Sequence, residues 1–533
     1  MTLRSALRVS RSAFGVSRDA SRDAPRDASR DAPSDAFRDA SRDGPRDASR
    51  DGRHDARRDA SGVILEGGGR GAAALATWNA AGLYSAAFVF WLLTRLLVLV
   101  HQGAWPWMNA FVVAAARGMV VGDWNDAVRP QLPAVLGVPL VLAGASEQQT
   151  VAALYLLASV VQLGAFVILV RAVFPDRMRE QTLALLVFLL VPYDHSIHHY
   201  RDVPVILASA AAFLLSAHFV GEVSRWRVRS DTAGGTPATA TFEIDDSTET
   251  EAARSRNAAS VARSAGASER LSRRQATVLK TITIFGIVLL GVWSRAEFLT
   301  FVAVLALLAI ILERRRALRL ALTYVAAAVL ISGGLLLIYK IEDVNLSQAS
   351  FYTAHTFLDS TPDSWLSPEC RADPTENCRE ADGLAYFGPA DLRAGVLALA
   401  MNHPLTTLAK SARSAWDNLW TLVGPNLSTF PGIIPFVVLA LAIVRPAREA
   451  YTRVPVAVWI AVAAVGAQSV LPPLTWAPPH PQYHLQLVFP IVMLVVPILV
   501  ALMGMPRGRL VALAFLIANA GLSAFRYTRY AGY

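Results

Sequence analysis

The hydrophobic positions of this chain gather into about eleven apolar stretches between residue 80 and residue 524. Most approach the roughly 20 residues that a helix needs to cross a hydrocarbon core of about 30 Å. In a helix the backbone N–H and C=O groups form hydrogen bonds with one another, and lipid offers them no other partner. The stretches are residues 80–100, 151–170, 181–191, 204–220, 278–292, 298–312, 322–337, 431–444, 454–470, 485–502 and 510–524. The pattern predicts an all-α polytopic membrane protein with about 11 transmembrane helices.

Arginine falls at every second junction between these stretches. In short loops, arginine marks the cytoplasmic side of a membrane protein. The predicted inner junctions carry Arg171, Arg177, Arg179, Arg314, Arg315, Arg316, Arg445, Arg448, Arg453, Arg507 and Arg509. The remaining loops therefore face outward, and they hold most of the residues that could do chemistry. We expect a multi-pass protein of the cell membrane whose active face is extracytoplasmic.

The composition agrees with this class. Of the 533 residues, 54% are hydrophobic, and the formal net charge is +9. This composition excludes a soluble globule. The surplus positive charge lies beside the apolar stretches, where arginine sets the topology and contacts anionic lipid head groups. It therefore predicts membrane lipid as a partner and no nucleic acid.

Polar segments divide the chain further. The expected organisation is a disordered tail at 1–78, helices one to four at 79–220 with a first outer loop at 101–149, a disordered cytoplasmic insertion at 221–276, helices five to seven at 277–338, an extracytoplasmic cap at 339–430 and helices eight to eleven at 431–533. Within the first outer loop, residues 105–121 and 133–142 are expected to form helices in the membrane interface.

The tail contains an Arg-Asp-small repeat over residues 17–60 with almost no apolar content. Such a segment cannot bury enough surface to fold. It is interpreted as a disordered cytoplasmic tail or the product of a wrongly assigned start codon, and alternatively as a charge-patterned interaction segment.

The first outer loop contains GDWNDAVRPQLP, which brings Asp123, Asp126 and Arg129 together. A carboxylate near lipid costs free energy unless water, a cation or a substrate compensates it. The two carboxylates are therefore either solvated helix caps or candidate general bases that take a proton from an acceptor hydroxyl.

The segment VPYDHSIHHYRDVP follows the third apolar stretch. It supplies Asp194, His198, Arg201 and Asp202. Three interpretations stay open for it: phosphate binding by the histidine and arginine groups, a divalent metal site without an established ligand spacing, and a polar interface cluster.

Two shorter outer segments add candidates. The turn WSRAEF contains Arg295 and Glu297, which are either a structural ion pair or substrate-binding groups. The segment PPHPQYHLQLVFP contains Tyr483 and His484, which either anchor the helix at the interface or contact substrate.

The chain has two cysteines, Cys370 and Cys378, both in the predicted cap. In an oxidising compartment they could form a small disulfide-closed loop, whereas in the cytosol they would stay reduced.

These segments, in this order, resemble the polytopic GT-C glycosyltransferases, in particular the bacterial branch with lipid A aminoarabinose transferase and the dolichyl-phosphate-mannose protein mannosyltransferases. The resemblance lies in the GDW and RPQLP segments, the short third stretch, the WSRAEF turn, the NHP of residues 402–404 and PQYHLQLVFP. Two positions depart from the family. Trp107, Met108 and Asn109 stand where members carry an early acidic residue, and Gln482 stands where members often carry arginine.

The resemblance implies a glycosyltransferase of the bacterial inner membrane that uses a polyprenyl-phosphate sugar donor and an acceptor of unknown class. Arg129, Arg201, Arg295 and His484 would stabilise the departing phosphate, and Asp123 or Asp126 would activate the acceptor with inversion at the anomeric carbon. No cofactor is certain, and a divalent metal is possible. The alternative is a non-catalytic relative or a polytopic lipid-binding or transport protein.

Overall fold

The computed structural model describes residues 69–102, 107–122, 131–190, 203–233, 275–341, 367–372, 385, 390, 396–423, 433–475 and 486–530. The chain divides into two compact units, Met1–Gly69 and Arg70–Tyr533, and all described residues except Gly69 belong to the second unit. The tail expected at 1–78 therefore lies mostly outside the described residues. Its last ten positions, 69–78, are already helical.

Every regular element in these ranges is a helix, as the sequence predicts. The helices are α2 (Gly69–Gln102), α3 (Trp107–Val121), α4 (Gln131–Leu142), α5 (Glu147–Val173), α6 (Met178–Leu190), α8 (Val203–Ala233), the helix Gln275–Val292, α10 (Phe298–Ile341), α12 (Pro368–Ala372), α15 (Val396–Asn402), α16 (Pro404–Val423), α17 (Ile433–Ile443), α18 (Arg445–Thr452), α19 (Val456–Thr475), α20 (Val488–Met503) and α21 (Pro506–Tyr530). Helices α3 and α4 occupy the positions expected for the two helices of the first outer loop.

Fewer helices than expected are long and apolar enough to cross a bilayer. Among the described residues there are four such helices, Glu147–Val173, Val203–Trp226, Gln275–Val292 and Ala317–Ile338, and a fifth if α18 and the following Val456–Leu471, bent by 96°, count as one span. Eleven spans are not confirmed. Helix α20 has 16 residues, which at 1.5 Å per residue gives about 24 Å, less than a hydrocarbon core.

Two predicted junctions also differ from the structure. The insertion expected at 221–276 is shorter, because α8 continues to Ala233 and the next helix begins at Gln275. Residues 313–316, expected as a loop between two spans, continue the helix of α10. In both cases the residues after the apolar stretch include Arg, Glu and Ala, which have high helix propensity, so the helix continues beyond the stretch.

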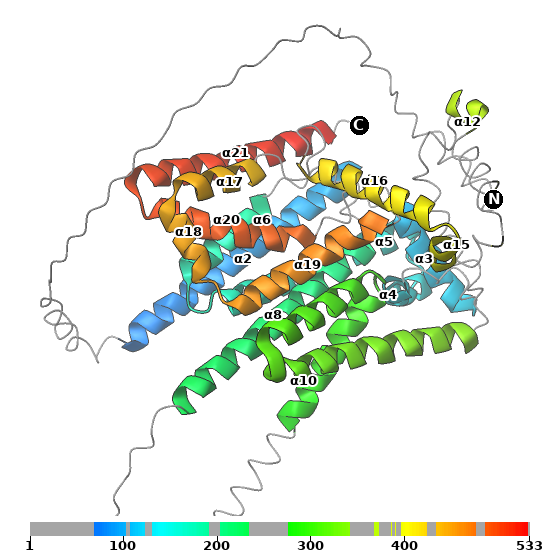
Figure 1. Ribbon diagram of the computed structural model, residues 1–533, viewed down its shortest axis with the longest axis horizontal. Coiled ribbons are helices and arrows are strands. Elements are labelled where there is room, and N and C mark those ends of the chain that lie inside the picture. The colour runs from blue at the N-terminus through cyan, green and yellow to red at the C-terminus, as the bar shows by residue number, and fades with distance from the viewer. Residues whose placement is uncertain are drawn as a thin grey trace, which may run out of the picture. The chain divides into compact units, whose positions relative to one another are not determined.

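The centre of the described bundle is formed by α5, α6, α8, α19 and α20 (Figure 1). A row of phenylalanine rings connects four of these helices. Phe166 of α5 stacks on Phe188 of α6 with ring centroids 4.1 Å apart, and lies 5.6 Å from Phe213 of α8. Phe213 in turn lies 6.4 Å from Phe489 of α20. Aromatic pairs in these geometries add about 0.5–1.5 kcal/mol beyond the area they bury.

A polar contact joins the same helices. Gln162 Nε2 of α5 donates to Ser209 Oγ of α8 at 2.7 Å, and the serine hydroxyl donates to Ile206 O one turn away. Both side chains are buried. Helix–helix hydrogen bonds of this kind contribute about 0.6 kcal/mol in a membrane.

Small residues bring α3 and α4 close together. Ala115, Ala116 and Ala134 are fully buried between them, and a Cβ added at Gly137 would lie 3.2 Å from the Cβ of Ala116. Such small residues are typical of helix pairs in membranes, because they let the backbones approach. The following helix, α5, begins at a capping box in which Ser146 and Gln149 bond each other's backbone N–H.

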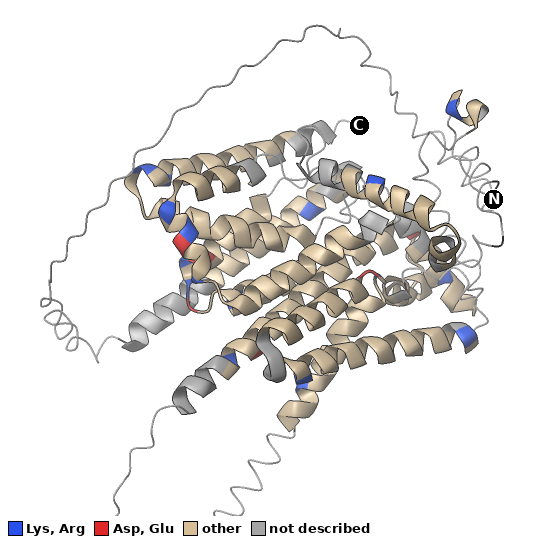
Figure 2. Ribbon diagram, in the orientation of Figure 1, with Lys and Arg blue, Asp and Glu red and all other residues tan. Residues whose placement is uncertain are grey.

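Among the coloured residues of Figure 2, Lys, Arg, Asp and Glu occur mainly near helix ends, with long stretches of other residues between them. One group of charged residues joins the two helices on either side of the insertion. Glu222 of α8 forms ion pairs with Arg225 of the same helix, at 2.7 Å, and with Lys280 of the next helix, at 3.0 Å. The end of α8 and the start of the helix Gln275–Val292 are therefore held together, although 41 residues of sequence separate Ala233 from Gln275.

We predict that Gly291→Ala destabilises the protein by about 1–3 kcal/mol, because the added Cβ would lie 2.4 Å from the buried ring of Phe298. The matched control is Gly286→Ala in the same helix, where nothing lies within 4 Å of the added Cβ. The control should leave stability unchanged or raise it by up to about 1 kcal/mol. Denaturant unfolding in detergent measures both, and equal effects would contradict the close approach.

Candidate functional site

The turn between the helix Gln275–Val292 and α10 is the part of the predicted site that the structure describes. Ser294 N and Arg295 N both donate to Gly291 O, at 3.2 and 2.9 Å, and Phe298 N donates to Arg295 O at 3.1 Å. The chain therefore reverses within five residues, from Trp293 to Glu297. The lack of a side chain at Gly291 leaves the space that the Phe298 ring fills.

Arg295 and Glu297 form an ion pair within this turn. Arg295 Nη2 lies 3.0 Å from Glu297 Oε1, and the two side chains are 14% and 21% exposed. Partial burial strengthens the attraction between them relative to an exposed pair. The structure thus contains the predicted pairing, and a contact with substrate stays a prediction.

A backbone hydrogen bond attaches this turn to α4. Leu132 N donates to Trp293 O at 3.0 Å. The first four N–H groups of a helix lack partners within it, and Leu132 is the second residue of α4, so the turn satisfies one of these groups. In sequence, Leu132 lies three residues after Arg129. The contact therefore joins the end of the GDW–RPQLP segment to the turn.

Two polar atoms beside the ion pair have no hydrogen-bond partner among the described residues. They are Trp293 Nε1 and Ser294 Oγ, and the serine side chain is only 1% exposed. A buried polar atom left unpaired costs about 1–3 kcal/mol. Water or a polar group of a ligand would remove this cost, which makes the turn a candidate binding site.

The other predicted site residues lie outside the described residues. They are Asp123, Asp126, Arg129, Asp194, His198, Arg201, Asp202, Tyr483 and His484. They belong to the segments between α3 and α4, between α6 and α8, and between α19 and α20. Within the described ranges, no group of three or more His, Cys, Asp and Glu side chains could hold a metal ion.

A buried arginine in α2 was missed by the sequence analysis. Arg95 is 6% exposed. Its Nη1 donates to the Tyr155 hydroxyl at 3.3 Å, and its guanidinium carbon lies 3.7 Å from the centre of the Trp91 ring. An ionisable residue inside an apolar stretch indicates function by default. Arg95 is the ionisable residue within the apolar stretch 80–100, and this position is the sequence signal for the contact with Tyr155 and Trp91.

Three buried polar side chains, Gln468, Ser469 and Gln486, lie towards the end of α19 and just before α20. The Ser469 hydroxyl of α19 is 3.5 Å from Gln486 Oε1, and both side chains are buried. Neighbouring Gln468 is 2% exposed, and neither its Oε1 nor its Nε2 finds a partner in the described part of the chain. Gln486 follows the predicted His484 by two positions in the sequence.

Cys370 is buried in α12 and is disulfide-bonded. The only other cysteine of the sequence, Cys378, lies outside the described residues. The bonded state is the one expected for an oxidising compartment, and the extracytoplasmic position of the cap stays a prediction.

Comparisons with protein-family models, curated proteins and solved structures found no match for this chain.

We predict that the Arg295–Glu297 pair has a coupling energy of about 1 kcal/mol or more in a double-mutant cycle with Arg295→Met and Glu297→Gln. The control cycle uses Arg445 and Glu449, which also lie 3.0 Å apart but are 84% and 51% exposed. That pair should couple by only a few tenths of a kcal/mol. Unfolding in detergent provides the free energies, and equal coupling in both cycles would show that burial does not strengthen the pair.

Proposed function

We propose that this chain is an integral membrane glycosyltransferase of the GT-C type, which moves a sugar from a polyprenyl-phosphate donor to an acceptor on the extracytoplasmic face. The observation that supports it most is the hydrogen bond from Leu132 N to Trp293 O, 3.0 Å long. It connects two segments on which the family resemblance rests, GDW–RPQLP and WSRAEF, although 160 positions separate the bonded residues in the sequence.

The turn supplies the electrostatics that such a reaction needs. Polyprenyl phosphate is already a fair leaving group, so cations that stabilise its charge help more than an acid that protonates it. Arg295 lies in the turn with its guanidinium paired to Glu297, which fixes the direction of the cation before substrate binds. Arg129, Arg201 and His484 are the further candidates for contacts with the phosphate.

The acceptor needs a base, and the GDW segment supplies one. Asp123 or Asp126 would take the proton from the acceptor hydroxyl as it attacks the anomeric carbon, with inversion of configuration. Arg129 follows Asp126 by three positions in the same segment. The same short segment would therefore supply both the base and a cation for the phosphate.

A non-catalytic relative that binds lipid is the second candidate. It is favoured by Asn109, which stands where the family carries an early carboxylate and lies in the first turn of α3. An amide cannot accept the acceptor proton, so activity requires that Asp123 or Asp126 replace that carboxylate.

We predict that membranes containing the protein transfer label from polyprenyl-phosphate sugars to an endogenous acceptor, and that Asp123→Ala or Asp126→Ala lowers the rate by about 100-fold or more because general-base catalysis is lost. The control is Glu449→Gln, which removes an exposed carboxylate of α18 and should leave transfer unchanged. Transfer of no label from any donor, with the lipid still bound, would favour the non-catalytic relative.

A further inference from the structure

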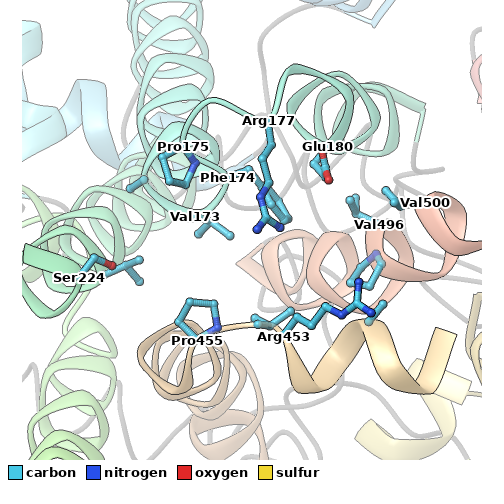
Figure 3. Close-up of a pocket in the computed structure, with 15 residues that line it drawn as sticks. Val173, Phe174, Pro175, Arg177, Glu180, Ser224, Arg453, Pro455, Val496 and Val500 are labelled. Atoms are coloured by element: carbon cyan, nitrogen blue, oxygen red, sulfur yellow. The ribbon is translucent and has the colours of Figure 1, made fainter. Parts of the chain in front are cut away.

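A cavity of about 250 Å³ lies among the ends of α5, α8 and α20 and the bend between α18 and α19. Most of its lining residues are apolar, among them Val173, Pro455 and Val496 (Figure 3). The candidate catalytic and phosphate-binding residues belong to segments predicted on the opposite face of the membrane, so the cavity is a separate feature.

The cavity and the WSRAEF turn lie at opposite ends of the same bundle. Ser224 lines the cavity and is two residues from Glu222, which contacts Lys280 at 3.0 Å. From Lys280 the helix runs thirteen residues to Trp293, or about 20 Å at 1.5 Å per residue. By the arginine pattern, the cavity end faces the cytoplasm.

Three charged side chains line the cavity. Arg177 reaches into it from the turn between α5 and α6, Arg453 lies along the opposite wall, and Glu180 stands beside Arg177 (Figure 3). Neither guanidinium makes an ion pair or a hydrogen bond with any residue that the structure describes. Two guanidinium groups and one carboxylate leave the lining with one net positive charge.

The turn that carries Arg177 is held firmly in place. Asp176 adopts φ 58°, a left-handed conformation that aspartate tolerates better than most residues. Gln181 Nε2 donates to Phe174 O at 2.7 Å, and its Oε1 accepts a hydrogen bond from the Tyr84 hydroxyl of α2. Because Gln181 is only 4% exposed, this buried network fixes the backbone from which Arg177 extends.

The opposite wall is fixed in a similar way. The Tyr451 hydroxyl of α18 donates to Leu494 O of α20, and Arg453 N donates to Ala450 O at 3.3 Å. The first bond attaches α18 to α20 three residues before Pro497 of the cavity wall, and the second closes the last turn of α18. Both arginines therefore extend from restrained backbone, so less conformational entropy is lost when a ligand orders them.

We propose that this cavity binds the phosphodiester of an anionic phospholipid from the cytoplasmic leaflet. Arginine pairs with phosphate oxygens in a bidentate geometry, and the apolar walls suit the glycerol backbone and the start of the acyl chains. The cavity is smaller than the roughly 300–1,000 Å³ of typical ligand pockets, so it accommodates a head group and not a whole lipid. The proposal is independent of the glycosyltransferase reaction.

The charge of the lining selects the type of phosphate. One phosphodiester carries a single negative charge, which neutralises the net charge of Arg177, Arg453 and Glu180. A phosphomonoester carries a charge of about −1.5 to −2 at neutral pH. Its second negative charge would have no cation left to pair with and would be repelled by the Glu180 carboxylate. Phosphatidylglycerol should therefore bind better than phosphatidic acid.

The test is a titration of the delipidated full-length protein with dioleoyl phosphatidylglycerol, with bound lipid counted by native mass spectrometry. Arg177→Gln and Arg453→Gln should each weaken binding about tenfold, as expected when one charge-assisted contact is lost. Both side chains are exposed to solvent, so the variants should unfold at the same temperature as wild type.

Two controls separate the cavity from the general basic surface. Arg448→Gln with Arg507→Gln removes two exposed arginines of the same predicted face that do not line the cavity, and it should change binding less than about threefold. Ser224→Phe fills the cavity without changing its charge and should weaken binding as the arginine variants do. Glu180→Gln should improve the binding of dioleoyl phosphatidic acid.

Equal losses in the cavity variants and in the Arg448→Gln/Arg507→Gln control would overturn the proposal, because binding would then depend only on surface charge. Unchanged binding in Ser224→Phe would overturn it as well. Displacement of the lipid by equal concentrations of inorganic phosphate or of deacylated glycerophosphoglycerol would show that the site takes a soluble phosphate and would exclude the lipid as its occupant.

Discussion

The need to satisfy polar groups away from water constrains this structure more than any other interaction. Lipid offers no hydrogen bonds, so a polar side chain among apolar helices is stabilised when it finds a partner within the protein. Gln162 meets Ser209, and Arg95 lies against Tyr155 and the Trp91 ring. These contacts join α5 to α8 and α2 to α5. They specify which helices are neighbours, whereas the apolar surfaces alone would pack against lipid equally well.

The unpaired polar atoms of the WSRAEF turn support its interpretation as a candidate binding site. Trp293 Nε1, Ser294 Oγ and both amide atoms of Gln468 are buried without a partner in the described ranges. The first two flank an ion pair on the turn that also caps α4. At the other end of the bundle, Arg177 and Arg453 line a cavity together with Glu180, and neither guanidinium forms an ion pair with a described residue. The two ends thus offer different chemistry, an oriented cation in a partly buried turn and a pair of cations between apolar walls.

The sequence predicted the helical class and the tight turn at residues 293–298, because both depend on local patterns of apolar, Gly and charged residues. It did not predict helix lengths well. Averaging hydrophobicity over a stretch hides the bend between α18 and α19, the short α20 and the continuation of α8 and α10 past their apolar parts. The same averaging hid Arg95 and Gln468, which stand beside Thr94 and Ser469 as short polar interruptions of apolar stretches.

The contacts between distant segments could not have been found from the sequence. The bond from Leu132 to Trp293 joins two segments that share no pattern, and the cavity is built from α5, α6, α8, α20 and the α18–α19 bend. Periodicity identifies a helix but does not choose its neighbour. The arginines at the junctions of the apolar stretches predict which loops face the cytoplasm, and the assignment of both proposed sites to a membrane face depends on that prediction.

The most direct measurement is therefore the labelling of single cysteines by a membrane-impermeant maleimide in sealed right-side-out vesicles, with Cys370 and Cys378 replaced by serine. Ala296→Cys places the thiol in the exposed turn beside the ion pair, and Arg448→Cys places it on exposed α18. We expect Ala296→Cys to react at once and Arg448→Cys only after the vesicles are permeabilised. Labelling of Arg448→Cys from outside, with Ala296→Cys protected, would reverse the orientation and contradict an extracytoplasmic active site.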